Sequence, residues 1–296
     1  MSDLAVRDKP LEYWFFWFNA GSLAFLVDYV IRRSLRIAEV RVSFWVDGLG
    51  RVERLSSPTW LASGARVDIA ECTFDEQSST GRVADVEWDL RLELGSSRID
   101  PAVPPIKWLN PFDMQIASRP RARFSGQVTV GDVTFSCEDV PGLVSHYWGR
   151  RLPDSWWWIS ANLFEDTDLA VEALLARTRV WNSARVAMNA GYLWIEDQGR
   201  RQLVIHPLNG LIRIEGTPES FTLRARQLGR PGFTLRCSAS PHSYNDLGED
   251  IQQTLLGTCV IQGMGEARGT AGLEIRSRAT APTTNWHPDD LGEQAV

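Results

Sequence analysis

Two carboxyl-bearing residues stand inside otherwise apolar runs of this 296-residue sequence. Glu172 lies in Leu169-Ala-Val-Glu-Ala-Leu-Leu-Ala176, and Asp28 lies in Leu23-Ala-Phe-Leu-Val-Asp-Tyr-Val-Ile31. Burial among such neighbours raises the pKa of a carboxyl group, which can then stay protonated and act as a general acid. Both residues are therefore candidate catalytic acids. The alternative is that each lies on a solvated strand face or pairs with an arginine such as Arg33 or Arg177.

A cluster of aromatic residues suggests where such an acid would work. The stretch from Ser145 to Phe164 reads SHYWGRRLPDSWWWISANLF and holds four of the 13 tryptophans. From Ser155 onward the side chains alternate with the period of two that is typical of a strand. One face would carry Trp156, Trp158, Ser160 and Asn162, and the other would carry Trp157, Ile159, Ala161 and Leu163. Because the second set is wholly apolar and needs a dry core, we expect the first set to line a cavity.

Tryptophan offers a flat, polarizable wall and one N–H donor, which suits a large apolar or polyene ligand. The alternative is that these are ordinary core tryptophans. Asn162 distinguishes the two, because a buried amide must find polar partners, and a ligand carbonyl, a hydroxyl or a bound water would serve. The candidate catalytic residues are Glu172, Asp28, His146 and Tyr147, with His146 to Trp148 expected at the rim of the cavity. The candidate substrate-binding residues are Trp14, Trp148, Trp156, Trp158, Asn162 and Trp194.

Motifs for bound cofactors do not occur in the sequence. It contains no phosphate-binding P-loop, no dinucleotide-binding G-x-G-x-x-G after a strand, no H-E-x-x-H and no G-x-S-x-G. The four histidines are far apart, and the four cysteines, Cys72, Cys137, Cys237 and Cys259, form no C-x-x-C pair. We therefore expect no metal, no cofactor and no disulfide framework, and a reducing cytoplasm is the expected location.

The charge pattern excludes some classes of partner. The formal net charge is −6, so no field across the whole chain attracts nucleic acid. The arginine pairs Arg32–Arg33 and Arg150–Arg151 are candidates for small anion contacts, although dispersed arginines usually lie on solvated strand faces. The apolar segment from Leu11 to Ile31 contains Glu12, Asn19 and Asp28, which favours a β-hairpin over a transmembrane segment. The expected partner is a hydrophobic small molecule.

The elements that must position these residues are strands. Strands are predicted over 12–18, 23–32, 37–47, 66–74 and 82–94, and again over 121–130, 132–138, 155–164, 169–179 and 191–196, with shorter ones to residue 277. In 37–47, Ala38, Val40, Val42, Phe44 and Val46 share one face, and Glu39, Arg41, Ser43 and Asp47 share a face expected to be solvated. Proline-rich Ile99 to Pro120, with Trp108 and Phe112, is predicted to be a packed loop. The class is all-β, with two barrel-like halves, residues 1–120 and 121–296.

Three places in the chain carry a family resemblance. Leu11-Glu-Tyr-Trp-Phe-Phe resembles an E-W-W-Y-type first strand, and His146-Tyr-Trp-Gly149 with Pro153, Trp156-Trp-Trp158 and Asn162 resembles a W-G…P…W-x-W…N block. Gly265-Glu-Ala-Arg-Gly-Thr-Ala-Gly-Leu-Glu274 resembles a glycine-rich closing strand with a glutamate. All three are similar to the lipocalin-like two-domain family of carotenoid 1,2-hydratase (hydroxyneurosporene synthase) and tocopherol cyclase. The chain departs from the tocopherol cyclase pattern at Ser160, where that pattern has glutamine, and in reading Glu-Tyr-Trp in the first strand.

The resemblance implies two lipocalin-like, calycin-type barrels and chemistry on terpenoid or polyene natural products. In that chemistry a C=C bond is protonated, and water or an internal nucleophile captures the cation, as in a hydratase (a hydro-lyase), cyclase or isomerase. An aromatic, water-poor cavity suits such a cation. Related folds also resemble pericyclases that fold a polyene for Diels–Alder closure without an acid. A carrier of hydrophobic ligands without catalysis is the third hypothesis, because fold does not settle function.

Overall fold

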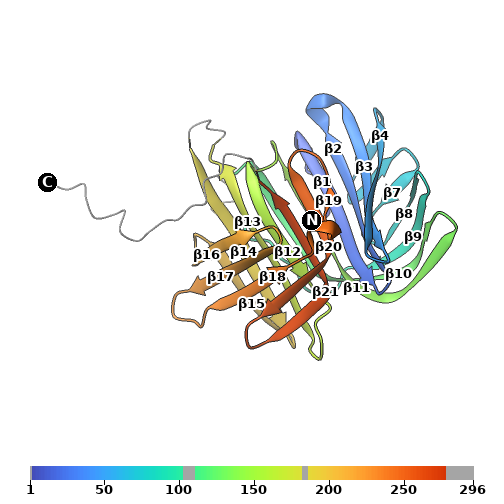
Figure 1. The fold of residues 1–296 in the computed structure, drawn as a ribbon. Coiled ribbons are helices and arrows are strands. Elements are labelled where there is room, and N and C mark those ends of the chain that lie inside the picture. The colour runs from blue at the N-terminus through green and yellow to red at the C-terminus, as the bar shows by residue number, and fades with distance from the viewer. Residues whose placement is uncertain (1, 103–110, 182–185, 278–296) are drawn as a thin grey trace.

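The computed structural model describes residues 2–102, 111–181 and 186–277. These parts of the chain are almost entirely antiparallel strand, with two 3-10 helices, Arg33–Leu35 (η1) and Pro241–Ser243 (η2), and no α-helix. The strands form two nearly closed β-barrels that lie side by side (Figure 1). The predicted all-β, two-barrel class is confirmed.

The first barrel is an 11-stranded sheet with the order β4-β3-β2-β1-β11-β10-β9-β8-β7-β6-β5. Every pair of neighbours is antiparallel, and the first strand, β1, pairs with the last strand, β11, along almost its whole length. Its strands are β1 (Leu11–Ala20), β2 (Leu23–Arg32), β3 (Ile37–Val46), β4 (Leu49–Ser57), β5 (Trp60–Ser63), β6 (Arg66–Ile69), β7 (Cys72–Phe74), β8 (Ser78–Val83), β9 (Val86–Glu93), β10 (Met114–Val130) and β11 (Val133–Gly149).

The second barrel is a 10-stranded sheet with the order β15-β14-β13-β12-β21-β20-β18-β17-β16, and β19 pairs with β20 beside this path. As in the first barrel, the first strand of the second barrel, β12, pairs with its last strand, β21. Its strands are β12 (Ser155–Ala161), β13 (Leu169–Arg179), β14 (Ala187–Asp197), β15 (Arg200–His206), β16 (Gly210–Thr217), β17 (Ser220–Gln227), β18 (Phe233–Ser238), β19 (Asn245–Asp246), β20 (Ile251–Ile261) and β21 (Gly265–Arg276).

The chain passes from one sheet to the other between β11 and β12, at residues 150–154. The division expected at residue 120 falls inside β10, where Pro120 lies in a register shift between Arg119 and Ala122. A bulge of this kind tolerates a residue that cannot donate a ladder hydrogen bond. The predicted loop ends before Met114, where β10 begins, and Trp108 lies outside the described residues.

Each barrel has its own apolar core, and a third cluster lies where the two barrels meet. The faces of β1, β2 and β3 that point out of the first barrel pack toward the second one. This arrangement corrects one prediction for β3, because Arg41 is half-buried and Ser43 is fully buried instead of solvated. The second barrel covers the polar face of β3, which forms part of the boundary between the two barrels.

One further prediction concerns the apolar segment from Leu11 to Ile31. It forms β1 and β2, an antiparallel hairpin with the turn between Ala20 and Leu23, as expected. Within the part of the chain that the structure describes, no helix has the length and apolar character needed to cross a membrane.

Candidate active site between the barrels

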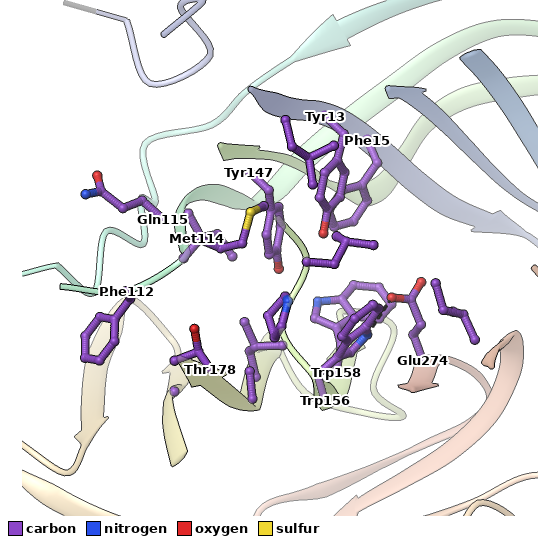
Figure 2. A pocket seen from close by; sticks show the side chains of 18 of the residues that line it. Tyr13, Phe15, Phe112, Met114, Gln115, Tyr147, Trp156, Trp158, Thr178 and Glu274 are labelled. Carbon is purple, nitrogen blue, oxygen red and sulfur yellow. Dashed lines mark hydrogen bonds between the residues drawn. The ribbon is translucent and has the colours of Figure 1, made fainter. Parts of the chain in front are cut away.

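A cavity of about 490 Å³ lies between the two barrels. Strands β1, β2, β3 and β11 form one wall, and strands β12, β13, β14, β20 and β21 form the other. Its walls are mainly apolar and aromatic, as in most small-molecule sites. Figure 2 shows Tyr13, Phe15 and Tyr147 from the first barrel facing Trp156, Trp158 and Glu274 from the second.

Strand β12 places its tryptophans as the alternation predicts. Trp156 and Trp158 line the cavity, whereas Trp157 and Ile159 pack in the core of the second barrel. Asn162, one residue past the end of β12, does not line the cavity, and neither does Ser160, which belongs to the same predicted face inside the strand. Both amide atoms of Asn162 are buried, and neither has a hydrogen-bond partner among the described residues.

Glu274 on β21 brings a carboxyl group to the cavity wall. Its Oε1 accepts a hydrogen bond from Trp156 Nε1 at 2.8 Å, and its Oε2 accepts one from Gln253 Nε2 at 2.6 Å. Burial raises the pKa of Glu274, and the negative charge of Asp28 raises it further. The sequence argument did not choose Glu274, although the closing strand of the family resemblance ends on it. A carboxyl group whose pKa is raised by burial therefore faces the aromatic walls.

Glu172 on β13 lies directly behind the wall and is fully buried. Tyr192 Oη donates to its Oε1 at 2.7 Å, and Ser118 Oγ donates to its Oε2 at 2.5 Å. Ser145 Oγ in turn donates to Ser118 Oγ at 2.7 Å. Burial raises the pKa of Glu172 from 4.5 to about 7, even though these donors favour the charged form. Tyr192 also lines the cavity. Glu172 can therefore exchange a proton with a molecule in the cavity through the Tyr192 hydroxyl group.

This raised pKa predicts how stability depends on pH. Between pH 4.5 and about 7 the folded protein binds a proton at Glu172 that the unfolded chain releases. Stability is therefore greatest below this window and falls as the pH rises through it, by about 3 kcal/mol from this group alone. We expect Glu172→Gln to remove that part of the decline. Urea unfolding of both proteins at pH 5 and pH 8 measures it, and equal declines in the two proteins would contradict the assignment.

Asp28 on β2 also lines the cavity, as part of an ion pair. Arg41 Nε and Nη2 lie 2.7 and 2.6 Å from Asp28 Oδ2. Burial raises the pKa of Asp28, and the Arg41 guanidinium opposes that effect. The alternative that Asp28 pairs with an arginine is confirmed. The partner is Arg41, across the β2–β3 ladder, and not Arg33 or Arg177. The pair places one carboxylate and one guanidinium at the polar end of an apolar cavity.

Three tyrosines add hydroxyl groups to the polar lining of the cavity. Tyr13 and Tyr147 stack with ring centroids 4.8 Å apart, and Tyr192 comes from the opposite barrel. Burial raises the pKa of all three hydroxyl groups well above the ordinary value, and neighbouring carboxylates add to the effect. The hydroxyl groups are therefore neutral hydrogen-bond donors at physiological pH. Of these residues, the sequence argument chose only Tyr147.

The structure places His146, Trp14 and Trp148 away from this cavity, because they occupy the opposite faces of β11 and β1. The His146 ring stacks on Trp14 with centroids 4.4 Å apart, and its Nε2 lies 3.5 Å from Glu12 Oε2. Burial lowers the pKa of His146, and the Glu12 contact opposes this. Trp14 Nε1 donates to the carbonyl of Leu4 at 2.8 Å, so these residues hold the N-terminal segment against the first barrel.

We expect His146→Ala to reduce stability without changing turnover. The substitution removes the imidazole that lies 3.5 Å from the fully buried Glu12 carboxylate and stacks on Trp14, and the void it leaves costs about 2–4 kcal/mol. Chemical denaturation measures the loss, and the turnover per folded molecule is compared at a temperature where both proteins are folded. A loss of turnover in fully folded His146→Ala would contradict this structural role.

Trp194 on β14 belongs to the cluster between the barrels but does not line the cavity. It pairs with Glu172 across the β13–β14 ladder and so packs behind the wall. Among the described residues, no group of three or more histidine, cysteine, aspartate or glutamate side chains is arranged to hold a metal ion. All four cysteines are buried as free thiols.

Comparison with known proteins identifies the fold. No protein-family model and no curated protein matches the sequence. Among solved structures, a protein from Nitrosomonas europaea provisionally assigned as AttH aligns over 93% of this chain and 96% of its own, with a TM-score of 0.64 and 14% identity. The structure of CghA aligns over 90% and 87% of the two chains, with a TM-score of 0.62 and 12% identity.

Kievitone hydratase from Nectria haematococca aligns over 90% of this chain and 88% of its own, with a TM-score of 0.56 and 9% identity. At these identities the likeness concerns the fold. The chain has the lipocalin-like two-barrel fold that these structures share, as the resemblance to the carotenoid 1,2-hydratase and tocopherol cyclase family led us to expect.

Proposed function

We propose that the chain is a cofactor-independent enzyme that protonates a C=C bond of a hydrophobic isoprenoid or polyene and then closes a ring or adds water. The observation that carries the proposal is Glu274, a carboxyl group of raised pKa on the wall of an aromatic cavity. A general acid must reach the reacting atom directly or through one intermediate group. Glu274 lines the cavity and meets the condition directly, whereas Glu172 meets it only through Tyr192.

The hydrogen bonds of Glu274 suit a proton donor. After the proton leaves, the carboxylate keeps the N–H groups of Trp156 and Gln253, which stabilise its charge. Burial and the nearby Asp28 charge raise the pKa of the group, which favours its protonated form before the transfer. Asp28 itself accepts two N–H contacts from Arg41, an arrangement that favours its charged form and suits it less as a donor.

The walls suit the cation that follows. Trp156, Trp158 and Tyr147 present aromatic faces, which attract a positive charge, and the other cavity walls are mainly apolar. Gln253 supports the hydration route, because its buried Oε1 has no partner among the described residues and Gln253 lines the cavity. That oxygen can accept a hydrogen bond from an attacking water. The name of kievitone hydratase, one of the fold neighbours, is a second reason to retain water addition.

Product mass tests this proposal. The purified protein is incubated with linear isoprenoids and polyenes, and the products are followed by mass spectrometry with heat-denatured protein as the control. Addition of water gives a product heavier by one water, and cyclisation gives an isomer with a new retention time. Unchanged substrates that nevertheless bind would contradict the enzyme proposal and favour a carrier.

A pericyclase is the second candidate. The observation that favours it is the set of neutral tyrosine hydroxyls and the Arg41 guanidinium around the cavity, which can polarise a substrate carbonyl without transferring a proton. In that reaction Glu274 has no chemical step, so the Glu274→Gln protein would keep its turnover.

A further inference from the structure

A second cavity, of about 240 Å³, adjoins the first and differs from it in character. Five arginines belong to its wall, from β2, β13, β21 and the β11–β12 connection. They are Arg32, Arg150, Arg151, Arg179 and Arg276. In contrast, the main cavity is dominated by apolar and aromatic side chains.

The two cavities share part of their walls. Leu11, Arg32, Leu35, Leu152 and Glu249 line both. A molecule that occupies the main cavity and extends past these residues therefore places its end among the arginines. The shared residues make the arginine-lined cavity an annex of the proposed active site.

Positive charge exceeds negative charge in this annex. Its wall contains two carboxyl groups, Asp154 and Glu249, against the five arginines. A third carboxyl group, Asp113, lies 2.9 Å from Arg151 Nε and 3.6 Å from Arg150 Nε. Among the described residues, and with Asp113 counted, the arginines outnumber the carboxylates by two, in a chain whose net charge is −6. The local excess is therefore opposite in sign to the charge of the whole protein.

Several of these guanidinium groups are held in place. Arg276 donates to the backbone carbonyls of Glu249 and Pro153, each at 3.0 Å. Arg32 Nη2 lies 3.2 Å from Glu249 Oε1, and Arg179 Nε lies 3.2 Å from Asp154 Oδ2. Guanidinium groups fixed in this way match the oxygens of a carboxylate or phosphate and lose little entropy on binding.

We propose that the substrate is an amphipathic anion, with a carboxylate or phosphate head in the arginine-lined annex and an apolar chain in the main cavity. This inference rests on the proposed function, because it takes the main cavity as the place of the reaction. It adds that the head anchors the chain, so that the C=C bond to be protonated lies at a fixed distance from that head.

Binding of matched charged and neutral probes tests the inference. cis-Parinaric acid is compared with cis-parinaryl alcohol, using energy transfer from tryptophan to the tetraene as the readout. Farnesyl phosphate is compared with farnesol by displacement of the bound alcohol probe, which separates phosphate from carboxylate as the preferred head. We expect at least one anion to bind roughly tenfold more tightly than its neutral partner at low salt. The preference should shrink as salt screens the charges.

The arginines are tested with the double variant Arg150→Gln, Arg179→Gln, since neither residue lines the main cavity. We expect it to lose the preference for the anion and to bind the alcohol as before. Arg213→Gln is the matched control, because Arg213 is exposed on β16, far from the annex in sequence and on another part of the sheet.

The possible failures are distinguishable. Equal affinity for acid and alcohol in the unmodified protein would overturn the anionic-substrate inference and leave the acid–base proposal standing. An anion preference that survives in the double variant would also overturn it. Glu274→Gln, which tests the reaction, is expected to keep the anion preference, so loss of turnover and loss of head-group binding are read separately.

Discussion

Replacing Glu274 by glutamine is expected to lower turnover on the order of 10²–10⁴-fold while leaving ligand affinity almost unchanged. Glutamine has nearly the same shape, and its oxygen can still accept the hydrogen bond from Trp156 Nε1 that is 2.8 Å long in the native protein. It has no acidic proton, so a C=C bond in the cavity would not be protonated. The measurement is kcat for a substrate found by the product-mass screen, together with Kd for the same compound.

Two further glutamate-to-glutamine changes control this result. Glu215 is 63% exposed on β16, where it pairs with Arg224, and its replacement should leave turnover unchanged. Glu172→Gln tests the relay through Tyr192. If Glu172→Gln abolished turnover while Glu274→Gln kept it, the acid would be Glu172 acting through the Tyr192 hydroxyl, and the assignment of Glu274 would be wrong.

Truncating Trp158 to alanine is expected to abolish turnover and to cost about 3–5 kcal/mol of stability. Its ring is 3% exposed and lies edge-on against Phe15 and Trp17, at centroid distances of 5.7 and 6.3 Å. Its removal leaves a void between the barrels and takes away an aromatic face next to the cation. Urea unfolding gives the stability, and kcat is measured where the variant is still folded.

The control for this second prediction is Trp181→Ala. Trp181 is 67% exposed, and surface substitutions of this kind change stability by about 0.5 kcal/mol or less. Trp158→Phe keeps an aromatic face and should retain part of the activity. A Trp158→Ala protein that is folded and as active as the unmodified one would contradict the role of the aromatic wall.

The alternation of side chains predicted the strands and the orientation of β12. Trp156 and Trp158 were placed on the cavity face because Trp157 and Ile159 require a dry core, and the structure has that register. Asn162, one residue past the end of β12, was expected on the same cavity face, but neither it nor Ser160 inside the strand lines the cavity. Periodicity therefore predicts which face of β12 a side chain takes, but not how far along that face the cavity extends.

The position of the cavity was not predictable from individual strands. It lies between the outer faces of two barrels, and an outer face with Glu39 and Arg41 has the pattern of a solvated one. Only the second barrel, more than 100 residues away in the sequence, covers that face and buries the Asp28–Arg41 pair. For the same reason Glu274 could not be chosen from its surroundings, because its partners Trp156 and Gln253 come from other strands.

Deuterium incorporation tests the central claim most directly. The reaction is run in D₂O, and the product is analysed by mass spectrometry and NMR. Protonation of a C=C bond by Glu274, whose proton exchanges with solvent, predicts one deuterium on carbon in each product molecule. A product formed at the same rate with no carbon-bound deuterium would contradict acid catalysis and identify the reaction as pericyclic.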